Sequence, residues 1–320
     1  MVPAETTPLV SVVIPTYGRP DYLPEAVRCV AEQTHERVEL VVVDDHSPEP
    51  IEPAVADVDV DGLARAEVVR HEENRGANAA RCTGISRSVG EFVAFLDDDD
   101  LWDPRYLERV ADRFEEGGSD VGVVLVGARV VDDDGERIGS VTPAADGRVT
   151  EAILRGTVQA GSFSRFVVRR SIVDAAGVPD DRLPSLQDKE WHIRLSTQCR
   201  YASVPEPLVT RRYTSHDQIT DDYEAKRDVS VPLLLRKHRD LAAEYGRDTE
   251  RRFVASLTRT LGFSALRNGY YRSALKHFLT ALGRDPTDAT SYLYLLVALG
   301  GPMTYKPARD VRRAIRNSRT

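Results

Sequence analysis

Short apolar strands alternate with helical segments over the first hundred residues, and this alternation restricts the fold more than any other feature. The β-branched run VSVVIPT (10–16) precedes a stretch with helical spacing, and VELVVVDDHS (38–47) repeats the design. AEVVRHEENRG (66–76) is a weaker strand, and EFVAFLDDDD (91–100) is a fourth. Continuous apolar strands separated by helices are typical of a largely parallel sheet covered on both faces. The sequence therefore predicts an α/β fold.

Polar residues follow each predicted strand. They occupy positions 16–19, 44–47, 74–76 and 97–100. In parallel sheets ligands bind beyond the carboxyl ends of the strands. We expect these four segments, which are far apart in the sequence, to meet along one edge of the fold.

Size and charge narrow the class of protein. The chain has 320 residues, enough for one catalytic domain and an appendage, because single cores stop growing near about 250 to 300 residues. A formal net charge of −8 argues against a general nucleic-acid binder. Cys29, Cys82 and Cys199 show no CxxC spacing, so neither a zinc site nor a disulfide framework is expected, and a reducing cytosol fits. No apolar run approaches the roughly 20 residues that cross a bilayer. We expect a cytoplasmic protein, either soluble or peripheral at the cytoplasmic membrane face.

The strand and helix alternation ends after the first 120 residues. The segment 121–139 predicts two strands joined by an Asp-Gly turn. Residues 150–218 are mixed, with a helix at LQDKEWHIRLSTQ, and from 219 onward the pattern is nearly all helical. We therefore predict two units, residues 1–218 and residues 219–320.

Four consecutive acids, Asp97 to Asp100, follow the fourth strand. Like charges side by side disfavour ionisation, so something must neutralise them. One explanation is that they cap the helix beginning near Pro104. The other is a divalent cation, because Mg²⁺ is commonly held by one or two carboxylates together with phosphate oxygens. In an extended conformation Asp97 and Asp99 point to the same side, so both can reach one ion.

Five segments together resemble glycosyltransferase family 2 enzymes of the GT-A fold. They are VSVVIPTYGRPDYLPEAV, ELVVVDDHS, NRGANAARCTGI, FLDDDDLWDPRYL and LPSLQDKEWHIRL, in the family's order and spacing over residues 9–215. The resemblance implies a Rossmann-like, mostly parallel sheet. It also implies metal-dependent transfer of a sugar, of the hexosyltransferase type, from a nucleotide diphosphate sugar to an acceptor hydroxyl, with inversion at the anomeric carbon.

The resemblance also assigns residues to the donor site. The positions that match nucleotide-sugar contacts are Pro15, Thr16, Tyr17, Arg19, Asp44, Asp45, Arg75, Arg81, Asp97 and Asp98, and those that match metal ligands are Asp97, Asp99 and His216. The family often has Asn where Gly18 or Arg19 stands. Each assignment has a structural alternative. Asp44 and Asp45 could form a turn, Arg75 and Arg81 could form surface ion pairs, and His216 could be a solvated loop residue. The cofactor implied is Mg²⁺ or Mn²⁺.

The segment LPSLQDKEWHIRL supplies a further acid. Helical spacing puts Asp188, Trp191 and Leu195 on one face. The structural alternative is a first-turn acid beside an ordinary core residue. The resemblance makes Asp188 the general base, which takes the proton of the attacking hydroxyl. Gln187 and Trp191 would then contact the acceptor, although the family usually has Glu where Gln187 stands.

The helical region contains a segment that resembles a tetratricopeptide unit, residues 269–288. One such unit cannot bury its apolar face alone, so it must pack on other helices or on another protein. Either a bundle closing off the catalytic domain or a partner-binding module is consistent with this pattern. The final stretch, KPARDVRRAIRNSR, has six basic residues against one acid. Next to the apolar YLYLLVALGGPM it fits an anionic membrane surface and a lipid-linked acceptor.

Three other classes share parts of this pattern. A sugar-phosphate nucleotidyltransferase usually has a Gly-rich, Arg-containing loop after its first strand, which IPTYGRPDYL lacks. A non-catalytic sugar-nucleotide-binding scaffold would act through the helical region, and the intact acids at 97–99 and 188 argue against it. A phospho-receiver domain also has acids at its strand ends, but the lysine that accompanies them in that class is missing from this sequence. The best-supported interpretation is a glycosyltransferase that acts on a glycan or lipid-linked glycan. UDP is the favoured nucleotide because the paired acids suit the ring N–H of uracil.

Overall fold

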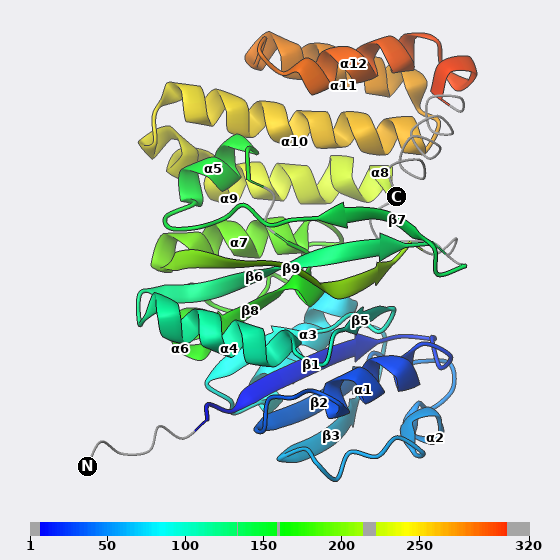
Figure 1. The fold of residues 1–320 in the computed structure, drawn as a ribbon. Helices are drawn as coiled ribbons and strands as arrows, with labels where there is room; N and C mark the ends of the chain where they lie inside the picture. The colour runs from blue at the N-terminus through cyan, green and yellow to red at the C-terminus, as the bar shows by residue number, and fades with distance from the viewer. Residues whose placement is uncertain (1–6, 133, 159–160, 214–221, 306–320) are drawn as a thin grey trace.

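The computed structural model describes residues 7–132, 134–158, 161–213 and 222–305, and its centre is a nine-stranded sheet (Figure 1). The strands are β1 (Val10–Thr16), β2 (Val38–Asp44), β3 (Arg65–Arg70), β4 (Phe92–Phe95), β5 (Asp100–Trp102), β6 (Val121–Val131), β7 (Arg137–Val141), β8 (Phe166–Arg169) and β9 (Arg200–Arg212). Their order is β3-β2-β1-β4-β8-β6-β9-β5, and β7 pairs with β6.

The first four strands pair with one another in parallel, as the sequence predicts. The β6 and β7 hairpin is also confirmed, with Gly135 in a left-handed conformation at its turn. The second half of the sheet is mixed, because β8 runs antiparallel to both β4 and β6, and β5 runs antiparallel to β9. The sheet is therefore parallel where the four polar strand ends lie.

Helices cover both faces of this sheet. They are α1 (Leu23–Ala31), α2 (Glu52–Val55), α3 (Ala77–Arg87), α4 (Tyr106–Gly117), α5 (Thr150–Arg155), α6 (Arg170–Ala176), α7 (Gln187–Gln198), α8 (Tyr223–Ala225), α9 (Val231–Glu244), α10 (Arg247–Arg267), α11 (Tyr271–Arg284) and α12 (Ala289–Leu299), with a 3-10 turn η1 (Phe163–Arg165) and a π turn η3 (Lys226–Ser230). Within the described ranges, none of them combines the length and the hydropathy that crossing a bilayer requires.

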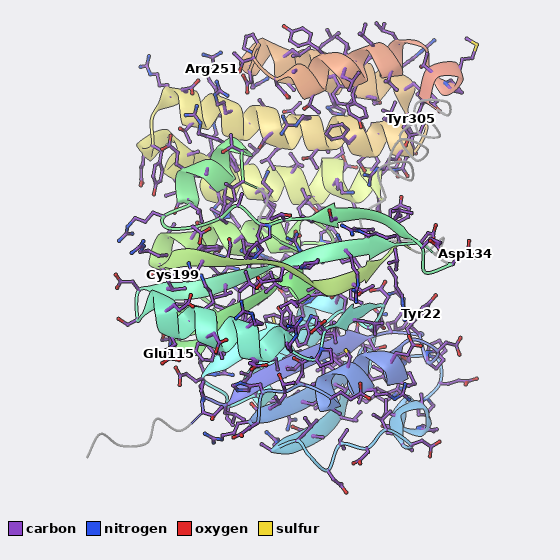
Figure 2. The ribbon with its side chains drawn as sticks, viewed as in Figure 1. Tyr22, Glu115, Asp134, Cys199, Arg251 and Tyr305 are labelled. Carbon is purple, nitrogen blue, oxygen red and sulfur yellow. The ribbon has the colours of Figure 1, made fainter. Side chains whose placement is uncertain are left out.

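Five strands, β1, β4, β6, β8 and β9, each contribute apolar side chains to two separate cores (Figure 2). In β1, Val12 and Ile14 pack with α1 and α4, while Val13 between them faces the opposite core. This division follows from the alternation of side chains along a strand. It explains why β1, β2 and β4 read as continuous apolar runs, since every residue of these strands is buried.

The C-terminal helices are part of the core on one side of the sheet. Figure 1 shows α9 to α12 stacked as a block; α5 contacts α10 of this block and α7, and α7 contacts β6 of the sheet. Leu234 and Phe253 of the block belong to the same apolar cluster as Phe95 of β4 and Trp191 of α7. The tetratricopeptide-like segment thus packs on neighbouring helices of its own chain. The predicted boundary near residue 218 lies outside the described residues and stays a prediction.

Candidate functional site

The carboxyl ends of β1 and β4 meet through direct hydrogen bonds. The buried Thr16 donates its Oγ1 hydrogen to Asp98 Oδ2 at 2.7 Å. Arg19, on the turn after β1, donates Nη1 to Asp98 Oδ1 at 3.0 Å and to Asp99 Oδ2 at 2.8 Å. Parallel pairing of β1 with β4 brings these strand ends to the same edge. Pro15 lies inside β1, and Tyr17 beside it is 49% exposed at this edge.

Three arginines neutralise the row of four acids. Arg19 pairs with the middle two, Arg81 Nη2 of α3 lies 2.6 Å from Asp97 Oδ1, and Arg211 Nε of β9 lies 3.9 Å from Asp100 Oδ2. Arginine side chains therefore supply part of the positive charge that the crowding of four acids requires. The cluster remains strained electrostatically, since burial raises the pKa of Asp98 to about 6 and that of Asp100 to about 8.

Asp97 and Asp99 nevertheless suit a divalent cation. Their side chains are 29% and 19% exposed, and each uses one carboxylate oxygen toward an arginine, Oδ1 of Asp97 and Oδ2 of Asp99. In the described part of the chain, no group of three or more His, Cys, Asp or Glu side chains is arranged to hold a metal. A pair of carboxylates completed by ligand phosphate oxygens is a common Mg²⁺ arrangement, so the residues present fit the implied ion. His216 lies outside the described residues.

The two acids at the end of β2 are buried and bonded to the protein itself. Asp44 forms an ion pair with Arg70 and accepts a hydrogen bond from the Ser47 backbone N–H at 2.8 Å. These contacts are those of a turn-forming acid, and they fix the loop that begins at the end of β2. Ser47 Oγ in turn accepts the Gly18 N–H at 2.9 Å, which ties the β1 loop to the β2 loop.

Asp45 fixes the backbone immediately before α3. Its carboxylate accepts the Arg75 and Gly76 backbone N–H groups at 2.9 and 2.7 Å and forms a hydrogen bond with His71 Nδ1 at 2.7 Å. Gly76 has φ +88°, which favours glycine, and it is the residue before α3. The guanidinium of Arg75 is exposed and makes no ion pair with the residues that the structure describes. Asp45 thereby positions a cationic side chain beside the strand ends.

Asp188 lies in the first turn of α7, and the same charges act on it as on the acid row. Burial raises the pKa of this carboxyl, while the Lys189 backbone N–H, which donates to Asp188 Oδ1 at 2.7 Å, and the charges of Arg81 and Arg211 oppose the rise. The charge of Asp97 adds to it. A carboxylate whose pKa is raised is a stronger base and accepts a proton more readily. Asp188 thus lies within electrostatic range of Arg81, Arg211 and Asp97, and its role as a base stays a prediction.

Trp191 is a core residue, which differs from the expected contact with an acceptor. It is fully buried, donates its indole N–H to the Gly177 carbonyl at 2.8 Å, and packs against Phe95 and Phe163. The aromatic cluster decides which side of α7 faces inward. Gln187 is partly exposed and donates its amide to the Leu183 carbonyl at 3.0 Å. Trp191 thus supports the helix that carries Asp188.

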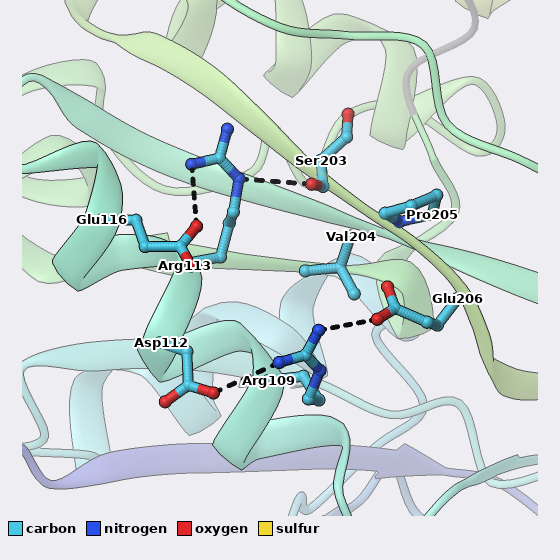
Figure 3. A pocket seen from close by; sticks show the side chains of 8 residues that line it. All are labelled: Arg109, Asp112, Arg113, Glu116, Ser203, Val204, Pro205 and Glu206. Atoms are coloured by element: carbon cyan, nitrogen blue, oxygen red, sulfur yellow. Dashed lines mark hydrogen bonds and ion pairs between the residues drawn. The ribbon is translucent and has the colours of Figure 1, made fainter.

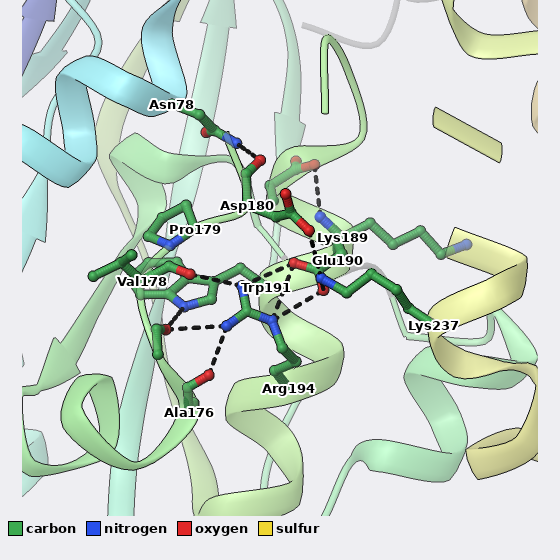
Figure 4. A network of polar contacts seen from close by, with 12 residues as sticks. Asn78, Ala176, Val178, Pro179, Asp180, Lys189, Glu190, Trp191, Arg194 and Lys237 are labelled. Atoms are coloured by element: carbon green, nitrogen blue, oxygen red, sulfur yellow. Dashed lines mark hydrogen bonds and ion pairs between the residues drawn. The ribbon is translucent and has the colours of Figure 1, made fainter. Parts of the chain in front are cut away.

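A buried polar network, which the sequence did not reveal, anchors the first turn of α7 (Figure 4). Glu190 is fully buried, and its carboxylate lies 2.5 Å from Lys237 Nζ, 3.1 Å from His238 Nε2 and 2.9 Å from Arg194 Nε. Lys237 also pairs with Asp180 at 2.7 Å. Two of these partners come from α9, so the C-terminal region holds the helix that carries Asp188. Only the sequence position of Glu190, two residues after Asp188, hinted at it.

A cavity of about 290 Å³ lies away from this edge, between α4 and β9 (Figure 3). Its charged side chains pair with one another: Arg109 contacts Glu206 at 2.7 Å and Asp112 at 3.4 Å, and Arg113 contacts Glu116 at 3.5 Å. None of the predicted site residues lines it. The strand-end cluster, rather than this cavity, is the candidate site.

Sequence comparison places the strand-end residues of the site, from Thr16 to Asp100, within a known family. Residues 11–177 match the model of "Glycosyl transferase family 2". TuaG of Bacillus subtilis (strain 168), named for teichuronic acid biosynthesis, is 40% identical over 103 residues, which cover 32% of this chain and 40% of TuaG. The match spans about two fifths of the length of TuaG.

Solved structures share the fold at low identity. The Staphylococcus aureus TarS fragment 1–349, in complex with UDP-GlcNAc, is 17% identical, with a TM-score of 0.59 over 87% of this chain and 92% of that one. The mannosyltransferase PcManGT of Pyrobaculum calidifontis, in complex with GDP-Man and Mn²⁺, is 18% identical, with a TM-score of 0.59 over 98% of this chain and 87% of that one. At these identities the similarity is one of fold.

Proposed function

The chain belongs to glycosyl transferase family 2, and we propose that it is a metal-dependent, inverting hexosyltransferase that moves a sugar from a nucleoside diphosphate sugar to an acceptor hydroxyl. The observation that carries the proposal is the meeting of Thr16 and Arg19 with the acids from Asp97 to Asp99 at one edge of the sheet. The charges of Arg81, Arg211 and Asp97, which act on Asp188, add support. TarS and PcManGT, which share the fold, were solved with nucleotide sugars.

The donor would lie across the ends of β1, β2 and β4. The loops held by Asp44 and Asp45 border the nucleoside, and the exposed guanidinium of Arg75 is available to the diphosphate. Asp97 and Asp99 would hold Mg²⁺ or Mn²⁺. A bound divalent cation neutralises charge that develops on a leaving diphosphate.

Asp188 would act as the general base. A hydroxyl becomes an effective nucleophile as its proton is removed, and a carboxylate within hydrogen-bond reach can accept that proton. Attack on the face of the sugar opposite the diphosphate breaks the bond from the anomeric carbon to the phosphate oxygen and inverts the configuration. The transition state has oxocarbenium character, as in glycoside hydrolysis. Burial of Asp188, which raises its pKa, favours the transfer.

We further propose UDP as the nucleotide and a glycan or lipid-linked glycan as the acceptor. TarS was solved with UDP-GlcNAc and UDP, and PcManGT with GDP-Man, so both nucleotides belong in the test.

A donor screen tests the proposal. The purified chain is incubated with UDP, GDP and TDP sugars, Mn²⁺ or Mg²⁺ and an acceptor panel, and released nucleoside diphosphate is measured. We expect metal-dependent release from one donor class, strongest with a UDP sugar. Release that no donor supports, together with no donor binding by calorimetry, would contradict the function. Release from a GDP or TDP sugar alone would contradict only the nucleotide assignment.

A further inference from the structure

The outermost helix of the C-terminal block exposes apolar side chains. We name Tyr292, Leu293, Leu296 and Leu299 of α12, with Met303 just after it, the α12 apolar stripe. These side chains are 50%, 59%, 65%, 65% and 83% exposed. Their spacing places the residues of α12 on adjoining positions of one helix face. Contiguous exposed apolar surface marks a contact site more often than isolated residues do.

The C-terminal part of the sequence is basic in an otherwise acidic chain. Residues 271–320 contain nine of the chain's 43 basic residues and three of its 51 acidic ones, which leaves 34 basic and 48 acidic residues in positions 1–270. Helix α11 carries Arg272, Lys276 and Arg284 without an acid, and α12 has no charged residue.

The two described acids between α11 and α12 are already paired. Asp285 and Asp288, between α11 and α12, form ion pairs with Arg252 and Arg259 of α10. Residues 306–320 lie outside the described structure, and their sequence holds six basic residues and one acid. Among the described residues of α11 and α12, which pack against each other, the charged side chains that form no ion pair are the basic ones of α11.

The combination of exposed apolar and basic side chains indicates which partner such a surface would bind. A second copy of the chain, docked through the same face, would bring two positive layers together, which charge repulsion disfavours. An anionic lipid bilayer offers both complements: apolar side chains enter the boundary between headgroups and acyl chains, and basic side chains are attracted to anionic headgroups. We propose that the α12 apolar stripe and the basic residues around it dock this protein on an anionic membrane surface.

Vesicle co-sedimentation of the full chain tests the docking. The probes are vesicles of phosphatidylcholine alone and vesicles with an equal share of phosphatidylglycerol. We expect binding at least tenfold stronger to the anionic vesicles, weakened by raising the salt concentration. Equal binding to both vesicles, or binding to neither, would overturn the proposal.

Two double variants separate the apolar and ionic contributions. Leu293→Ser with Leu296→Ser, and Arg272→Glu with Lys276→Glu, should each lower anionic-vesicle binding at least tenfold, because the four side chains are exposed. Val89→Ser, which changes a side chain 69% exposed in the acidic part of the chain, is the matched control and should bind like the wild type. Melting curves establish that each variant is folded. If the leucine variant instead keeps vesicle binding, or loses only self-association, the surface serves another partner and the proposal is wrong.

Discussion

Replacing Glu190 by glutamine should destabilise the protein in a pH-dependent way. Glutamine keeps the shape of the side chain and some hydrogen bonding but removes the charge that faces Lys237, His238 and Arg194. Burial by itself would raise the pKa of this carboxyl. The hydrogen bonds from His238 and Arg194 and the charge of Arg194 outweigh burial and lower the pKa from 4.5 to about 2.

The size of the effect follows from the two pKa values. At about 1.4 kcal/mol per pH unit, the difference between 4.5 and about 2 corresponds to about 3 kcal/mol of stability at pH 7. Because the folded pKa is the lower one, this contribution is complete above the unfolded pKa and is lost as the pH falls toward the folded pKa. At pH 3.5 roughly 1.4 kcal/mol of it should already be gone. A cost of this order agrees with the roughly 3 to 5 kcal/mol of breaking a buried ion pair.

Urea unfolding of the wild type and Glu190→Gln at pH 7, 5 and 3.5 measures this difference. We expect a gap of about 3 kcal/mol at pH 7 that narrows by more than about 1 kcal/mol at pH 3.5. Glu244→Gln is the matched control: it is on α9, which also supplies two partners of Glu190, but its side chain is exposed and should change stability by less than about 0.5 kcal/mol. A gap below about 1 kcal/mol at pH 7, or one that stays constant with pH, would refute the reasoning.

Three further predictions concern the site and the helical block. Asp188→Asn should lower turnover at least about a hundredfold without weakening donor binding, and the exposed Asp240→Asn is the control that should leave turnover unchanged. Steady-state kinetics measures turnover, and calorimetry measures donor binding. Unchanged turnover in Asp188→Asn would remove this residue from the mechanism. Asp99→Ala and EDTA should each weaken donor binding in calorimetry, and binding insensitive to both would exclude the metal role. Gly262→Ala should destabilise α10 by about 1 to 3 kcal/mol, because the added Cβ would lie 2.7 Å from the buried Phe278 ring. The control is Gly283→Ala, where a Cβ meets nothing within 4 Å, and it should stabilise the protein by a few tenths of a kcal/mol. Urea unfolding of both variants measures the difference. If both substitutions raise the urea midpoint, the packing around Gly262 is not close.

Much of the sheet could be predicted from the sequence because the signals are local. Apolarity on both faces and β-branched residues define β1, β2 and β4, and the helices between them require parallel pairing. From that topology alone, the strand ends near Thr16, Asp44 and Asp97 had to share an edge. The antiparallel insertion of β8 carries no comparable local mark, because it depends on how the chain returns after β6.

The sequence by itself determined which residue types stand at the carboxyl ends of the strands, since strand periodicity and chain order fix that edge. Only the tertiary structure decided their partners. Arg81 meets Asp97, and Arg19 meets Asp98, across 16 and 79 positions of sequence. The rotation of α7, which buries Trp191, and the grip of α9 on Glu190 likewise depend on packing among distant elements. The sequence shows where a charged or aromatic residue stands. Which residue neutralises or covers it depends on proximity in three dimensions.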